Sequence, residues 1–297
     1  MRFGILPRFH RDAIVEPDWV VAFARAVEDA GADSVWTVEH TVVAEDYEPR
    51  YPYSRDGRMA DHPDTVMPDP LEWLSFVAAC TERMLLGTAV MVVPEHPPVV
   101  LAKRVATLDR LSRGRVRLGV GIGWQKEEYA AIGVPYARRG ARLDEHLDAL
   151  RALWGPDPVS FNGEFVSFDR VRSEPKPARA AGVPIVVGGS TDAAARRAGT
   201  RGDGFFPYVI SPDDLAARLV TMRAAARDAG RDPDAVEVTV WPGSWQHGGS
   251  LDVDLARRYA DAGADRLVLS AQETRGGTVD DVRRLVEEYR TRVIDRL

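Results

Sequence analysis

Apolar residues follow two different spacings along this chain, and the two spacings alternate. Short apolar runs in which β-branched residues are frequent are typical of strands. We predict strands at residues 3–8, 34–40, 85–93, 115–123, 184–189, 204–208, 236–241 and 266–270.

Between these runs, apolar residues recur every three or four positions, which is the period of an α-helix. Val20, Phe23 and Val27 show this spacing in the segment that Pro17 opens. Asp69 followed by Pro70 is typical of a helix start, with an N-cap residue and then proline at the first helical position. We predict helices from residue 17, from residue 70, at 98–112, from about residue 124, and at 139–154, 191–201, 213–229, 251–262 and 279–293.

The alternation of eight strands with helices predicts an α/β fold, the (β/α)8 TIM barrel. A doubly wound sheet is the main alternative, but it would usually carry a glycine loop after its first strand, and residues 7–10 contain no glycine. We expect a single domain over residues 1–297, with insertions at about 44–68 after the second strand and 156–182 before the fifth. Both insertions are expected to be excursions over the barrel, and Asn162-Gly163 in the second predicts a hairpin turn.

Composition limits the class of protein and its partners. Hydrophobic residues make up 45% of the chain, enough for a substantial core, and the only cysteine, Cys80, excludes an intrachain disulfide. No apolar run approaches the roughly 18–20 residues of a membrane span, and the N-terminus lacks a signal-peptide pattern. The net charge is −6 and the basic residues are dispersed, which disfavours nucleic acid and membranes as partners. We therefore expect a cytoplasmic protein.

The predicted strand at 115–123 ends in glycines at alternate positions, Gly119, Gly121 and Gly123. Glycine weakens a strand interior, so this repetition needs a reason. One interpretation is that a flat ring or an anion lies against the backbone, next to the start of the following helix. The other is tight packing between neighbouring strands. The pattern alone leaves both open.

A second glycine turn, Gly188-Gly189-Ser190, stands directly before a predicted helix. The free N–H groups of that helix, together with a hydroxyl, could bind a phosphate. Alternatively, Ser190 or Thr191 is simply the N-cap of the helix.

His40 ends an apolar strand at the expected location of the active site, since catalytic residues of a barrel lie at the carboxyl ends of its strands. Neutral imidazole exchanges protons near pH 7, although a single histidine is often a structural residue. Glu39 is expected to point to the other side of the strand or out of the mouth. The remaining histidines are less promising: His10, His62, His96, His146 and His247. Because no pair has metal-ligand spacing, a metal-dependent hydrolase is disfavoured and no metal is predicted.

Five stretches, in this order, resemble the bacterial-luciferase-like oxidoreductases: residues 36–40, 86–91, 108–124, 139–146 and 185–190. The chain is most similar to the branch of that family that depends on the deazaflavin coenzyme F420. Enzymes that use flavin mononucleotide (FMN) share the same barrel and much of the pattern, so an FMN-dependent monooxygenase is the first alternative. A non-catalytic barrel that carries cofactor is the second.

The resemblance implies hydride transfer between coenzyme F420 and a small organic substrate, with His40 as the acid–base group. It implies a bulge with a non-proline cis peptide at Ala89-Val90, and it allows a homodimer. The cofactor contacts expected on this basis are Glu39, Thr88, Ala89, Val90, Met91, Ile122, Gly123, Trp124, Gly188, Gly189 and Ser190.

The chain also departs from part of that branch. Some of its sugar-phosphate dehydrogenases have aspartate before the histidine and glutamate after the strand-four glycine, where this chain has Glu39 and Trp124. They also have a tryptophan shortly after the histidine, where this chain has residues 41–44, Thr-Val-Val-Ala. These differences disfavour a sugar-phosphate substrate.

Overall fold

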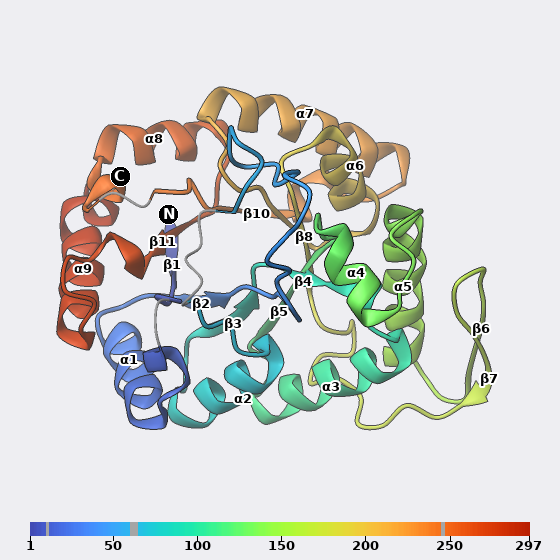
Figure 1. Ribbon diagram of the computed structural model, residues 1–297. Coiled ribbons are helices and arrows are strands. Elements are labelled where there is room, and N and C mark those ends of the chain that lie inside the picture. The colour runs from blue at the N-terminus through green and yellow to red at the C-terminus, as the bar shows by residue number, and fades with distance from the viewer. Residues whose placement is uncertain (10–11, 60–64, 245–246) are drawn as a thin grey trace.

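The strands form a closed parallel barrel in the computed structural model, which describes residues 1–9, 12–59, 65–244 and 247–297 (Figure 1). The strand order is β3-β2-β1-β11-β10-β9-β8-β5-β4, and β3 also pairs with β5. Since β3 and β4 are two segments of one barrel strand, the barrel has eight strands, which confirms the predicted fold. The strands are β1 (Arg2–Leu6), β2 (Ser34–Thr37), β3 (Leu85–Thr88), β4 (Met91–Val92), β5 (Val116–Gly121), β8 (Ile185–Gly188), β9 (Gly204–Phe206), β10 (Glu237–Val240) and β11 (Arg266–Ser270).

Helices surround the barrel and cover its outer face (Figure 1). The predicted start at Asp69 is confirmed, because its carboxylate accepts hydrogen bonds from the backbone N–H groups of Leu71 and Glu72. The helices are α1 (Pro17–Asp29), α2 (Pro70–Cys80), α3 (Pro98–Leu111), α4 (Lys126–Ile132), α5 (Arg139–Trp154), α6 (Asp192–Arg201), α7 (Pro212–Asp228), α8 (Val253–Ala262) and α9 (Val279–Arg292). Short 3-10 helices include η2 (Val93–Glu95), η4 (Gly249–Leu251) and η5 (Ala271–Glu273).

The indole of Trp36 fills the barrel interior between two strands that carry glycine. A Cβ atom at Gly4 would lie 2.7 Å from Nε1 of Trp36, and a Cβ at Gly87 would overlap the six-membered part of the same indole. The ring of Phe206 lies 4.9 Å from the Trp36 ring. One large side chain thus fills this layer of the core in place of several small ones. The neighbouring strands carry glycine at the positions that face the indole, because a larger residue there would collide with it.

The third barrel strand bulges inward between β3 and β4, and this bulge explains three of the strand glycines. The Ala89-Val90 peptide is cis, as the resemblance implied. A Cβ at Gly119 would overlap the carbonyl oxygen of Thr88, and a Cβ at Gly121 or Gly188 would lie 2.5 Å from a methyl group of Val90. Of the two interpretations of the glycine pattern, tight packing between strands is therefore confirmed at these positions.

The second insertion is a hairpin, as predicted, but its turn and its place differ from the prediction. Its strands β6 (Val159–Asn162) and β7 (Ser167–Val171) are joined by a four-residue loop, in which the N–H of Gly163 donates to the carbonyl of Val166. The hairpin lies outside the ring of helices, beside α5 (Figure 1). The Glu145 carboxylate on α5 accepts hydrogen bonds from three backbone N–H groups of the loop. The expectation that this insertion covers the barrel is wrong, because these N–H groups bind α5 from outside.

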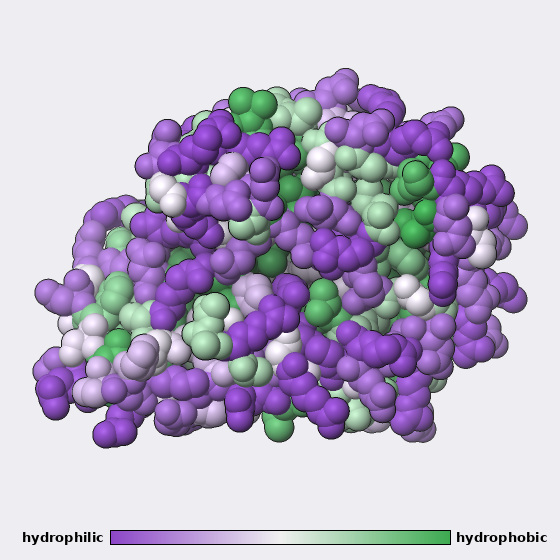
Figure 2. Space-filling view, turned by 180° about the vertical axis from the view of Figure 1, so that it is seen from behind, coloured by the Kyte–Doolittle hydropathy of each residue, from purple (hydrophilic) through white to green (hydrophobic). Residues whose placement is uncertain are grey.

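The face of the molecule seen in Figure 2 is covered mostly by hydrophilic residues, with hydrophobic residues in small groups between them. Within the described part of the chain, no helix combines the length and the apolar character that crossing a membrane requires.

Candidate functional site

His40 and Glu128 form a pair at the carboxyl end of the barrel. His40 follows β2, and its Nδ1 lies 2.8 Å from Oε2 of Glu128, which α4 supplies after β5. The side chains are 10% and 1% exposed. Since the carboxylate accepts a hydrogen bond at Nδ1, it orients the ring and leaves Nε2 with no hydrogen-bond partner among the described residues. No pattern in the sequence distinguishes Glu128 from its neighbour Glu127.

The segment after β2, residues 41–59, crosses the mouth of the barrel, and we call it the lid segment. It is drawn in blue inside the ring of helices in Figure 1. Its beginning is fixed to the start of α4, because Oε1 of Glu128 accepts a hydrogen bond from the N–H of Thr41 at 2.6 Å and Oε1 of Gln125 accepts one from the N–H of Ala44 at 3.2 Å. The first insertion is thus an excursion over the barrel, as expected, and residues 60–64 of it lie outside the described residues.

A continuous row of aromatic rings joins the lid segment to the barrel rim. We call the following residues the aromatic row: Tyr47, Trp124, Tyr51, Tyr53, Tyr208 and Trp241. The Trp124 ring contacts both Tyr47 and Tyr51 edge-on, with centroids 5.0 and 5.2 Å apart. At the other end, Tyr53 meets Tyr208 at 4.6 Å. The signal in the sequence that could have indicated the aromatic row is the spacing of three tyrosines within a polar insertion.

The predicted cofactor contacts of the barrel strands divide into accessible and enclosed residues. The half-exposed ones form a surface at the mouth: Ala89, Val90, Ile122, Gly123, Trp124, Gly188, Gly189 and Ser190. Thr88 and Met91 are 1% and 0% exposed, and the Thr88 hydroxyl donates to the carbonyl of Gly119 at 2.6 Å. The structure therefore brings most of the predicted residues together, and it places Thr88 and Met91 in the layer beneath them.

The second glycine turn is held by its own hydrogen bonds. Thr191 is the N-cap of α6 and accepts from the N–H of Ala194, so one of the two capping alternatives is confirmed. The Ser190 hydroxyl donates to the carbonyl of Tyr208 at 2.6 Å and also interacts with Tyr53 of the lid segment. Gly189 has a φ of +113°, which favours glycine. The turn thus connects the start of α6 to the aromatic row.

A second histidine–carboxylate pair lies beneath the first. Glu39 is 6% exposed, and its carboxylate accepts a hydrogen bond from the N–H of Val92 while Oε1 lies 2.9 Å from Nε2 of His96. Both oxygens are thus engaged by the third barrel strand and the turn after it, so Glu39 positions this strand. His146 is also buried nearby, and its Nδ1 lies 3.3 Å from the carbonyl oxygen of Val93. Burial lowers the pKa of His146. Neither His96 nor His146 had been favoured from the sequence, and His10 and His62 lie outside the described residues.

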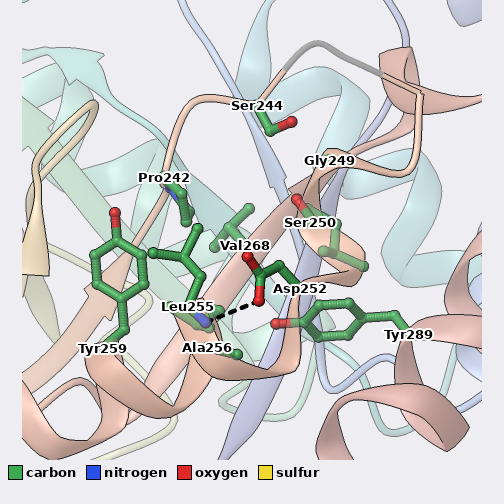
Figure 3. Close-up of a pocket in the computed structure, with 12 residues that line it drawn as sticks. Pro242, Ser244, Gly249, Ser250, Asp252, Leu255, Ala256, Tyr259, Val268 and Tyr289 are labelled. Atoms are coloured by element: carbon green, nitrogen blue, oxygen red, sulfur yellow. Dashed lines mark hydrogen bonds between the residues drawn. The ribbon is translucent and has the colours of Figure 1, made fainter.

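A small cavity between β10, η4, α8 and β11 is distinct from this site (Figure 3). Its volume is about 30 Å³, which is room for about one or two water molecules and not for a planar cofactor. At its edge the Asp252 carboxylate caps α8 by accepting from the N–H groups of Asp254 and Leu255. Throughout the described ranges, no cluster of three or more histidine, cysteine, aspartate or glutamate side chains is arranged to hold a metal ion.

Comparison with known proteins agrees with this architecture. The family model described as luciferase-like monooxygenase matches residues 1–244. An uncharacterized protein of Mycobacterium tuberculosis is 35% identical over 247 residues, covering 82% of this chain and 85% of the relative. The F420-dependent glucose-6-phosphate dehydrogenase of Nakamurella multipartita is 31% identical over 284 residues, covering 92% of this chain and 76% of the relative. The coenzyme F420-dependent tetrahydromethanopterin reductase of Methanopyrus kandleri shares the fold, with a TM-score of 0.77 at 15% identity over 99% of both chains.

Proposed function

Because the chain belongs to the luciferase-like monooxygenase family, we propose that it is an oxidoreductase that transfers a hydride between coenzyme F420 and a small organic substrate. The observation that carries the proposal is the His40–Glu128 pair, which presents Nε2 of the imidazole at the mouth of the barrel. The F420-dependent relative supports the choice of F420 over FMN as the cofactor.

The half-exposed surface at the mouth suits a flat ring with a phosphate-bearing tail. Ala89, Val90 and Ile122 provide an apolar floor, since these side chains become accessible directly after fully buried strand residues. The turn at Gly188–Ser190 leads into α6, whose N-terminus favours an anion. We assign the ring to the floor and the phosphate to the turn. When bound there, the deazaflavin would supply the hydride chemistry.

The protein's own contribution is proton exchange at Nε2 of His40. With Nδ1–H donated to Glu128, Nε2 carries a lone pair and can take a proton from a substrate hydroxyl, or return one to a substrate oxygen in the reverse direction. The positive charge that forms on the imidazole is stabilised by the Glu128 carboxylate, in the way that a buried carboxylate supports a catalytic histidine elsewhere. The lid segment covers this position and limits the access of water.

The test is His40→Ala in single-turnover hydride transfer. We expect the rate to fall by roughly 10²–10⁴-fold, which is the usual contribution of a general acid or base. The dissociation constant of F420 should stay the same, because His40 is not one of the floor residues. A wild-type rate would remove His40 from this role.

The cofactor is tested separately by titrating the cofactor-free protein with F420 and with FMN, and by mass and absorbance of any cofactor that copurifies from a deazaflavin-producing host. Tight binding of FMN alone would reverse the choice of cofactor. It would favour a monooxygenase, the activity after which the family is described.

A further inference from the structure

Glu39 and His40 are consecutive residues after β2, and each binds a different segment at the mouth of the barrel. His40 is paired with Glu128 at the start of α4. Glu39 instead binds the third barrel strand and the turn after it, through the N–H of Val92 and the ring of His96. Because one peptide bond joins Glu39 to His40, the position of the third strand and the position of the acid–base imidazole depend on each other.

The end of β2 holds the third barrel strand at two points, one on each side of its bulge. The N–H of Ala89 donates to the carbonyl of Thr37 at 2.6 Å, and the ladder between β2 and β3 ends at Thr37. After the bulge, the N–H of Val92 donates to the Glu39 carboxylate instead of to the backbone of β2. Thr37 and Glu39 therefore hold the Ala89–Val90 part of the floor from both ends.

His96 fixes the direction of the Glu39 carboxylate. Both side chains are largely buried, and Nε2 of His96 lies 2.9 Å from Oε1 of Glu39. A carboxylate oxygen only accepts, so Nε2 carries the hydrogen of this bond. His96 is itself held in place, since its backbone N–H donates to the carbonyl of Val93 at 3.1 Å and Pro97 follows it at the start of α3. The carboxylate is thus held between a fixed ring and the strand.

We propose that His96 is a positioning residue for the cofactor: by donating to Glu39 it keeps this carboxylate on Val92, and so holds the floor in place beneath the F420 ring. This inference rests on the proposed function. In the described part of the chain, no hydrogen bond or ring contact joins His96 to His40 or to the floor, so His96 acts through Glu39. Loss of its hydrogen bond frees the carboxylate to rotate away from Val92, which displaces the floor.

The experiment compares His96→Gln with His96→Asn. The amide nitrogen of Gln can stand where Nε2 of the imidazole lies and donate to Glu39, whereas the shorter Asn side chain does not reach it. In a binding titration with F420, His96→Asn should raise the dissociation constant about tenfold over wild type, because a hydrogen bond to a charged group is lost. His96→Gln should stay within about twofold of wild type, since the donor is restored.

Glu28→Ala is the matched control, because it loosens the same barrel strand at its other end. The Glu28 carboxylate accepts hydrogen bonds from the N–H groups of Arg83 and Met84, directly before β3. Urea unfolding should show a loss of stability for this variant, while the dissociation constant of F420 should stay within about twofold of wild type. Binding weakened about tenfold by Glu28→Ala as well would show that any loosening of this strand has the same effect, and would overturn the specific role of His96.

Amide hydrogen exchange of Val92 in the cofactor-free protein tests the same hydrogen bonds without F420. The Val92 amide should exchange slowly in wild type and His96→Gln, and about tenfold faster or more in His96→Asn. Wild-type exchange together with wild-type F420 binding in His96→Asn, or fast exchange in wild type itself, would overturn the inference. The expected exchange pattern in a wild-type protein that does not bind F420 would support the role of His96 in holding the strand and contradict the proposed function instead.

Discussion

The carboxyl group of Glu95 should make the stability of this protein fall as the pH rises through neutrality. Glu95 belongs to η2, is 4% exposed, and has no hydrogen-bond partner for either oxygen among the residues that the structure describes. Burial, followed by the negative charges of Glu128 and Glu39, raises the pKa of Glu95 to about 9. Tyr129 faces the same region, and its own pKa is raised by burial and by Glu95.

The sign follows from the difference between the folded and unfolded states. In the unfolded chain Glu95 loses its proton near its ordinary pKa of 4.5, whereas the folded protein keeps the proton up to a pKa of about 9. Between these values folding takes up one proton, so the free energy of unfolding decreases as pH rises. The slope is about 1.4 kcal/mol per pH unit, which gives about 3 kcal/mol between pH 6 and pH 8. The stabilisation is complete below the unfolded pKa and is lost as pH rises through the folded pKa.

Glu95→Gln isolates this effect, since the amide is neutral at every pH and has nearly the same shape. Urea unfolding at pH 6, 7 and 8 should show wild-type stability decreasing relative to the variant by about 3 kcal/mol over this range. Glu287→Gln, at an exposed position of α9, is the control and should give a curve parallel to wild type. Parallel curves for wild type and Glu95→Gln would show that Glu95 is already ionised in the folded protein and would refute the reasoning.

Two further substitutions test the fold around the site. Gly119→Ala should lower the free energy of unfolding by about 3 kcal/mol or prevent folding, because its methyl group would overlap the carbonyl oxygen of Thr88; a loss below 1 kcal/mol in urea unfolding would contradict the packing explanation of this glycine. Thr191→Ala should cost about 1 kcal/mol in the same measurement, since it removes the hydroxyl that accepts from the N–H of Ala194 at 3.2 Å, and unchanged stability would show that the cap contributes nothing there.

The elements of this fold could be predicted because each depends on local patterns. The hydrophobic periods located every barrel strand and its helix, and Asp69-Pro70 located a helix start to the residue. The boundaries at the mouth were less predictable, since β2 ends at Thr37 and leaves Glu39 and His40 in irregular backbone. Strands at a functional mouth are shaped by contacts with other loops, and those contacts leave no periodic signal.

The candidate site was predictable only in its separate parts. His40 could be selected from its position after a strand, but its partner Glu128 is 88 residues away in the sequence. The glycines of β5 could be noticed, but their cause lies in Val90 and Thr88 of another strand. Contacts of this kind depend on the closed barrel, so a single sequence without its fold cannot identify them.

The strand that closes the barrel lies outside the segment that the family model matches. The match to the family ends at residue 244, yet β11 at Arg266–Ser270 pairs with β1 on one side and with β10 on the other. A fragment cut at the end of the match would expose the backbone of two strands along an open seam, and such edges invite aggregation. A minimal version of this protein must therefore retain residues that lie beyond the match to the family model.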